Sequence, residues 1–162
     1  MSTTRDVRRL AFQALYQLDA RQDEPAQTVL ESVAEDHEAL GALSVGERRK
    51  ALELARGAFE GRSNADAFML AAAPDWPPHR QAAVDRAILR LAHHEMTAGI
   101  SPPKVAVNEA IELAKTFSTE RSPSFINGLL DKLLKKLSGT PAGSDLDSGE
   151  APALLAPDSA QA

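Results

Sequence analysis

A segment rich in arginine and aromatic residues near the N-terminus has the composition of a nucleic-acid contact. It reads TRDVRRLAFQALYQ and covers residues 4–17. At about 100° per residue, a helix places four of these residues within about 60° of one another: Arg5, Arg9, Phe12 and Tyr16. Guanidinium groups bind phosphates and an exposed ring stacks on an unpaired base, so this side suits single-stranded RNA. Short arginine clusters are also common on solvated helix faces, and these residues alone leave both interpretations open.

Two groups of ionisable residues raise the question of metal binding or acid–base catalysis. His93, His94 and Glu95 are consecutive, whereas metal ligands on a helix usually lie three or four residues apart, so a packed or solvated histidine pair is the better interpretation. Glu109 and Glu112 lie one turn apart, but the chain lacks the Glu-x-x-His motif of di-metal bundles, and a structural or interfacial contact is expected. No phosphate-binding glycine loop or nucleophile motif occurs, so we expect no metal, no cofactor and no enzyme activity.

Composition indicates a single domain from a reducing compartment. The 162 residues are 43% hydrophobic, enough to bury one core, and contain no cysteine, which fits the cytoplasm. No run approaches the roughly 20 apolar residues of a bilayer span, and no apolar signal core follows the N-terminus, so we expect no membrane association.

The net charge is −5, but four of the 23 acidic residues follow Leu137, which leaves 19 acidic and 18 basic side chains before it. Any basic function must therefore be a local patch.

The spacing of apolar residues predicts an all-α protein. They recur at intervals of three and four, and aromatic residues make up only 4% of the chain. Helix starts are indicated by the cap Thr4, the capping box SVGE at 44–47, and Ser122 with Pro123, whereas PDWPP at 74–78 is a firm break. We expect a compact bundle of about seven helices in two small subdomains.

The expected folded domain covers residues 1–137, with halves at about 4–73 and 78–137. Its second helix is expected to extend through Leu40, with Gly41 closing it. Residues 138–162 are rich in Pro, Gly, Ser and Asp, which predicts a disordered acidic tail.

Four segments carry a family resemblance. In order they are RRLAFQALYQ, then Trp76 and Arg80 followed by VDRAILRLAHHE, then KVAVNEAIELAKTF, and finally FINGLLDK. Together they resemble the NusB family of bacterial transcription antitermination factors. The resemblance implies an all-helical protein that binds boxA RNA, a single-stranded element of ribosomal-RNA operon transcripts. It also implies joint binding with NusE, a ribosomal small-subunit protein, on the RNA polymerase elongation complex.

The resemblance implies roles for the residues that match the family's motifs. The implied RNA-binding residues are Arg5, Arg8, Arg9, Tyr16, Arg86, Arg121 and Phe125, and the implied NusE-binding residues are Asp85 and Glu109. Asp6 interrupts the arginine run, and Ser118 stands where a glycine commonly ends the preceding helix. Neutralising about three phosphates gives a log–log salt slope of only about −2 for single-stranded RNA. We therefore expect a composite RNA surface that is shared with NusE.

Two other functions stay open at this point. A helical RNA-binding module at the N-terminus of certain ribosomal-RNA cytosine methyltransferases resembles this family, although those proteins continue into a large α/β catalytic domain. Alternatively, the chain is a protein-interaction adaptor whose Arg5 side is plain solvent surface. A homodimer also stays open, because apolar surfaces beyond the core could pair two copies.

Overall fold

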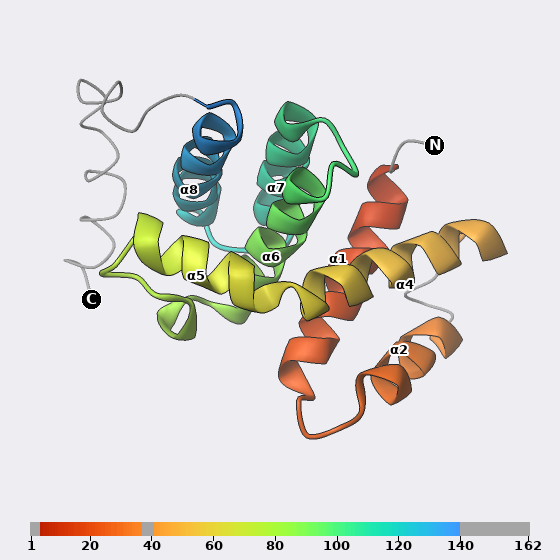
Figure 1. Cartoon of the computed structure of the whole chain (residues 1–162). Coiled ribbons are helices and arrows are strands. Elements are labelled where there is room, and N and C mark those ends of the chain that lie inside the picture. Colours follow the sequence, from red (N-terminus) through yellow and green to blue (C-terminus); the bar gives the residue numbers. More distant parts are fainter. Residues whose placement is uncertain (1–3, 37–40, 140–162) are drawn as a thin grey trace.

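Helices and their connections make up the described part of the chain. The computed structural model describes residues 4–36 and 41–139, and no strand occurs within those ranges (Figure 1). In chain order the elements are α1 (Arg5–Ala20), α2 (Ala26–Glu35), α4 (Val45–Glu60), α5 (Arg62–Ala72), the short 3-10 helix η1 (Pro78–Arg80), α6 (Ala83–Thr97), α7 (Pro103–Phe117) and α8 (Ser122–Leu137). The predicted all-α fold class is confirmed.

Capping side chains set the starts of α1 and α4. The Thr4 hydroxyl oxygen accepts a hydrogen bond from the Val7 amide at 3.2 Å, at the start of α1. Ser44 and Glu47 form the predicted reciprocal capping box at the start of α4. Each cap satisfies backbone amides that the first helical turn leaves unpaired. These capping predictions are confirmed.

The second helix is shorter than expected. It ends at Glu35, and Asp36 adopts an extended conformation with φ −79° and ψ 99°. Aspartate is a weak helix former because its side chain competes for nearby backbone hydrogen bonds. The expected continuation toward Leu40 is therefore wrong at Asp36. Leu40 itself lies outside the described residues, as do residues 140–162 of the predicted tail at 138–162.

Two groups of helices share one core. Figure 1 shows α1, α2 and α4 on one side and α5, α7 and α8 on the other. Helix α6 joins the groups, because it contacts α1 and α4 as well as α5, α7 and α8. The buried side chains form a single hydrophobic cluster that includes Leu10, Leu15, Ile88 and Ile126. The predicted halves at about 4–73 and 78–137 stay a prediction.

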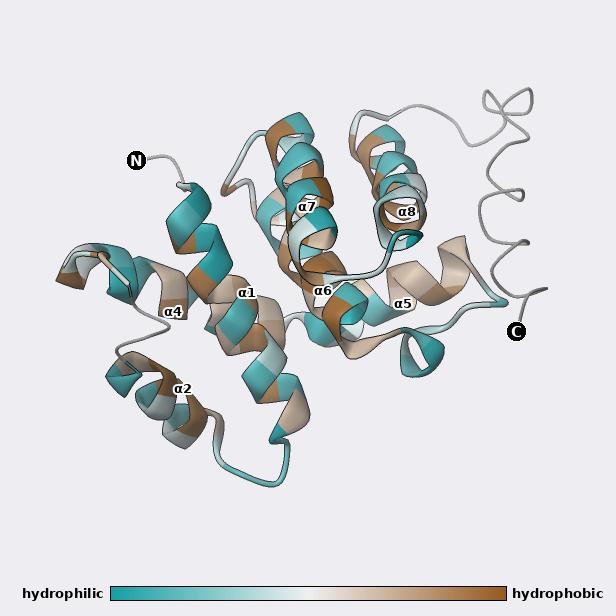
Figure 2. Ribbon diagram, turned by 180° about the vertical axis from the view of Figure 1, so that it is seen from behind, coloured by the Kyte–Doolittle hydropathy of each residue, from teal (hydrophilic) through white to brown (hydrophobic). Residues whose placement is uncertain are grey.

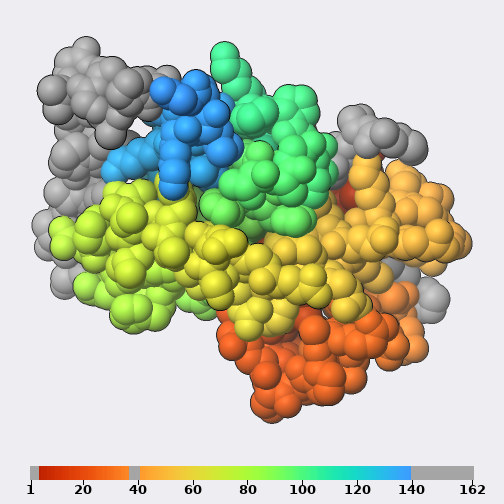
Figure 3. All heavy atoms as spheres, in the orientation of Figure 1, coloured from red at the N-terminus to blue at the C-terminus, as the bar shows by residue number. Residues whose placement is uncertain are grey.

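Figure 2 shows how hydrophilic and hydrophobic residues are distributed along the helices. Hydrophilic and hydrophobic positions alternate around each helix, as expected of elements with one buried face (Figure 2). On the face seen in Figure 3, α4 and α5 run across the middle, with α6 to α8 above them and α2 below. Within the described residues, no helix combines the length and the apolar character needed to cross a bilayer.

Candidate nucleic-acid interface

One side of α1 combines two arginines with aromatic rings from two helices. Arg5 and Arg9 are exposed on the first turns of α1, and Tyr16 is exposed further along the same helix. The guanidinium of Arg9 lies over the ring of Phe117, the last residue of α7, 5.9 Å from the ring centroid. A cation over an aromatic face is attracted by the ring quadrupole, so the two side chains form one surface. We call Arg5, Arg9, Tyr16 and Phe117 the α1 flank.

Phe12 does not belong to this exposed surface, contrary to the expectation from helical spacing. Its ring is buried and packs at a tilt against Phe117, with ring centroids 5.1 Å apart. The end of α7 covers position 12, so Phe117 supplies the aromatic surface instead. Sequence reasoning did not single out Phe117, because the spacing within α7 does not say which helix its last residue meets.

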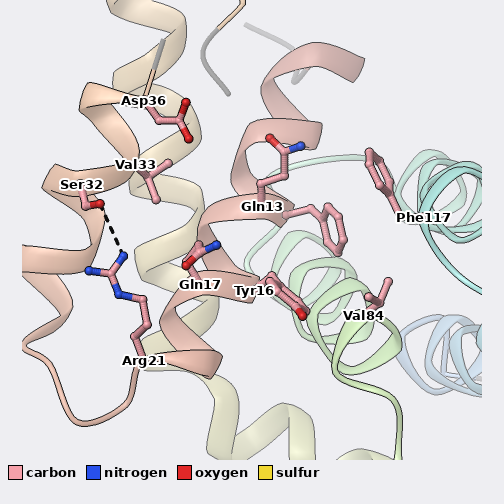
Figure 4. Close-up of a pocket in the computed structure, with 10 residues that line it drawn as sticks. Gln13, Tyr16, Gln17, Arg21, Ser32, Val33, Asp36, Val84 and Phe117 are labelled. Carbon is pink, nitrogen blue, oxygen red and sulfur yellow. Dashed lines mark hydrogen bonds between the residues drawn. The ribbon is translucent and has the colours of Figure 1, made fainter. Parts of the chain in front are cut away.

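A groove of about 620 Å³ continues from the α1 flank (Figure 4). Figure 4 shows the α1 side chains between those of α2 on one side and those of Phe117 and Val84 on the other. The lining residues are Phe12, Gln13, Tyr16, Gln17, Arg21, Ser32, Val33, Asp36, Val84 and Phe117. The side-chain oxygen of Gln13 is buried without a hydrogen-bond partner among the described residues. The groove therefore has aromatic, aliphatic and polar side chains along its walls.

Arg8 points into the protein and is fully engaged there. Its Nε donates to Glu95 Oε2 at 2.9 Å, and its Nη2 donates to Glu95 Oε1 at 2.7 Å. The Ser101 hydroxyl accepts from Arg8 at 3.2 Å and donates to Glu95 at 2.7 Å. The side chain of Arg8 is only 3% exposed and that of Glu95 only 1%. The expected RNA contact of Arg8 is therefore corrected: this arginine joins α1 to α6.

Arg86 and Arg90 of α6 hold the other end of α1 through Asp19. Nitrogen–oxygen distances to Asp19 are 2.6 Å from Arg86 and 3.0 Å from Arg90, and Arg90 also reaches Asp66 of α5 at 2.7 Å. Burial raises the pKa of Asp19, but hydrogen bonds and charge from the two arginines outweigh burial, so this pKa lies below its usual range. Arg86 donates further to two backbone carbonyl oxygens. Its RNA contact stays a prediction.

The loop between α7 and α8 is tied to α6 by Asp85. The Ser118 hydroxyl donates to Asp85 at 2.6 Å and the Ser122 hydroxyl donates to it at 2.9 Å. Asp85 and Phe125 are buried, with exposed fractions of 8% and 4%. Both side chains lie inside the protein in the absence of partners, so their burial does not support the expected NusE contact of Asp85 and RNA contact of Phe125, which stay predictions. Arg121 is exposed on this loop, and its RNA contact stays a prediction.

Glu109 of α7 faces the N-terminal end of the α1 flank. Its two carboxylate oxygens accept hydrogen bonds from Arg5 at 3.1 and 3.0 Å. These bonds and the charge of Arg5 hold the pKa of Glu109 below its usual range, against a smaller opposing effect of burial. The expected NusE contact of Glu109 stays a prediction.

The two consecutive histidines are packed between helices. A Cβ atom at Gly57 of α4 would lie 2.5 Å from His94 Nε2, so the glycine makes room for this ring. The His93 ring packs at a tilt against Phe68 of α5, with ring centroids 5.9 Å apart. Burial lowers the pKa of both histidines. Within the described residues, no group of three or more His, Asp or Glu side chains could hold a metal ion.

Asp19→Asn should weaken the fold most at neutral pH. Because the pKa of Asp19 is lowered in the folded protein, its carboxylate stabilises the fold fully above the pKa of the unfolded chain, about 3.9, and this contribution is lost as the pH falls further. Urea unfolding should show a constant difference in free energy between the parent and the variant down to about pH 5, and convergence of the two as the pH falls below about 4. Asp23→Asn, at an exposed position, is the control. A pH-independent difference for Asp19→Asn would contradict this role.

Arg8→Ala should cost about 3–5 kcal/mol of the free energy of unfolding, because it leaves the buried Glu95 carboxylate without its partner. Arg9→Ala is the matched control, since it removes the neighbouring but exposed arginine and should change this free energy by about 0.5 kcal/mol or less. Urea unfolding of the two variants provides the comparison. Similar small losses of unfolding free energy in both variants would show that the buried pair of Arg8 with Glu95 contributes little to the stability of the fold.

Comparisons with known proteins agree with this architecture. The chain matches the model of the NusB family over residues 5–135. Transcription antitermination protein NusB of Symbiobacterium thermophilum is 40% identical over 145 residues, which cover 87% of this chain and 94% of that protein. A solved structure of T. maritima NusB has a TM-score of 0.72 and 33% identity, and the match covers 84% of this chain and 94% of that chain.

A more distant chain shows the same fold. It comes from a crystal structure of antitermination factors NusB and NusE in complex with double-stranded RNA, with a TM-score of 0.70, 22% identity, and coverage of 82% of this chain and 96% of that chain. The family match begins at the first residue of α1 and ends in α8. It thus includes every helix that builds the α1 flank and its supports, and the chain belongs to the NusB family.

Proposed function

We propose that this chain is a cytoplasmic transcription antitermination factor that binds boxA RNA of ribosomal-RNA operon transcripts jointly with NusE and supports elongation by RNA polymerase. The similar protein of Symbiobacterium thermophilum bears the name of a transcription antitermination protein. In this chain, the observation that carries the proposal is the contact of the exposed Arg9 with the partly buried ring of Phe117, which lines the groove. The proposed role is that of a binding factor and includes no catalytic step.

The α1 flank offers the groups that single-stranded RNA requires. Arg5 and Arg9 are cations for phosphates, while Tyr16 and Phe117 are ring faces for unpaired bases. Phosphate attraction and stacking thus converge on one surface.

Burial of Arg8 makes this surface a weaker RNA binder than the sequence suggests. Two phosphates neutralised by Arg5 and Arg9 give a log–log salt slope of at most about −1.4 for single-stranded RNA, reached only if both arginines are fully available to phosphates. A stacked base adds about 1–3 kcal/mol. Such a surface binds weakly alone, which supports a shared RNA site completed by NusE.

Arg5→Ala combined with Arg9→Ala should lower the affinity for boxA RNA in the presence of NusE by roughly tenfold or more, because each arginine can make a charge-assisted bond to phosphate. Fluorescence anisotropy with boxA and scrambled RNA, with and without NusE, measures this. Arg49→Ala with Arg56→Ala removes the same charge from α4 and is the matched control. If NusE raises neither affinity nor sequence preference, or if both pairs have equal effects, the shared RNA site on the α1 flank is contradicted; if no RNA binds under any of these conditions, the chain is instead an adaptor.

Tyr16→Leu should cost about 1–3 kcal/mol of RNA binding through lost stacking, whereas Tyr16→Phe should keep most of the affinity. The same anisotropy titration compares the two variants. A loss with Tyr16→Phe as large as that with Tyr16→Leu would assign the effect to the hydroxyl group and not to the ring.

A further inference from the structure

The side of Arg5 best suited to bind a phosphate is already occupied by a carboxylate of the same chain. Arg5 is the first residue of α1, with a side chain 63% exposed, whereas that of Glu109 is only 17% exposed. The Nε and Nη2 atoms of Arg5 meet Glu109 Oε1 and Oε2 at 3.1 and 3.0 Å. This two-pronged geometry is the one in which a guanidinium binds a carboxylate or a phosphate.

Glu109 is held in place to make this contact. Its Oε1 also lies 3.7 Å from Nη1 of Arg8, and Arg8 is fixed by its buried pair with Glu95. Hydrogen bonding by Arg5 lowers the pKa of Glu109, so this carboxylate is charged at neutral pH. Glu109 is therefore a fixed anion, while Arg5 is a mobile cation that can leave it.

The ion pair between Arg5 and Glu109 is weak enough for a phosphate to replace it. An ion pair with one strongly exposed partner is weak in water, because solvent and salt screen it. An RNA phosphate can therefore replace Glu109 at Arg5, but it must do so beside a negative charge that stays in place. This repulsion lowers the affinity for every phosphate that approaches Arg5.

We propose that Glu109 is an intramolecular competitor of RNA for Arg5, which holds the affinity of the free protein for RNA below the level that the arginines alone would give. This inference rests on the proposed function and extends it. Base stacking and NusE contacts then have to supply the remaining affinity. The carboxylate thus makes the protein depend on its partner and limits its binding to unrelated single strands.

Glu109→Gln should raise the affinity for boxA and scrambled RNA by roughly three- to tenfold without NusE. It should also steepen the log–log salt slope by about 0.7, because one more phosphate contact becomes effective. Anisotropy titrations over a salt series measure both quantities. NusE is omitted, so that a NusE contact of Glu109 does not enter the result.

Two further variants separate competition from other effects. Glu112→Gln removes the same charge from a neighbouring carboxylate that pairs with Lys115 at 3.5 Å, and it should change the affinity less than twofold. In an Arg5→Ala background, Glu109→Gln should have no effect on RNA affinity. An increase that persists without Arg5 would overturn the competition, as would unchanged or reduced affinity in the single variant.

The outcomes distinguish this inference from the function on which it rests. If the parent binds boxA RNA with NusE and Glu109→Gln leaves affinity and salt slope unchanged, only the competition fails. If neither the parent nor the variant binds RNA under any condition, both fail. Urea unfolding of Glu109→Gln, compared with the parent, shows whether the fold is retained.

Discussion

The buried pair of Arg8 with Glu95 determines which way α1 faces. Two charges removed from water must stay matched, and separating them inside the protein costs several kcal/mol. Helix α1 therefore cannot turn or slide on α6 without leaving one charge alone. Because neighbouring positions on a helix differ by about 100°, fixing Arg8 inward directs Arg9 outward. An interior bond thus sets the position of the exterior cations.

Much of the fold was predictable because its signals are local. Thr4, Ser44 and Glu47 cap helices through atoms a few residues away, and such contacts depend little on the rest of the molecule. Asp36 illustrates the limit, since the apolar pattern continued past a residue that ends α2. The spacing of apolar residues therefore predicted the presence of the helices better than it predicted their last residues.

The site was less predictable, because contacts between distant segments form it. Phe12 and Phe117 are 105 positions apart, and only the packing of α7 on α1 decides that Phe12 is buried and Phe117 is partly accessible. A signal for Arg8 was present, since it precedes the buried Ala11 and Leu15 by three and seven residues and so lies on their side of α1. A charged residue on an apolar stripe needs a buried partner. Spacing alone could not identify Glu95, 87 positions away, as that partner.

The two walls of the groove are held with unequal firmness. On one side, Phe117 directly precedes Ser118, whose hydroxyl is bound to the buried Asp85, so moving that wall requires breaking hydrogen bonds on α6. On the other side, α2 is a helix of 10 residues that buries only Val29, Leu30 and Val33. Elements with few buried contacts open at lower free energy than the rest of a fold. The groove is therefore expected to widen by displacement of α2, and the size of the ligand that it can admit then depends on how readily α2 moves.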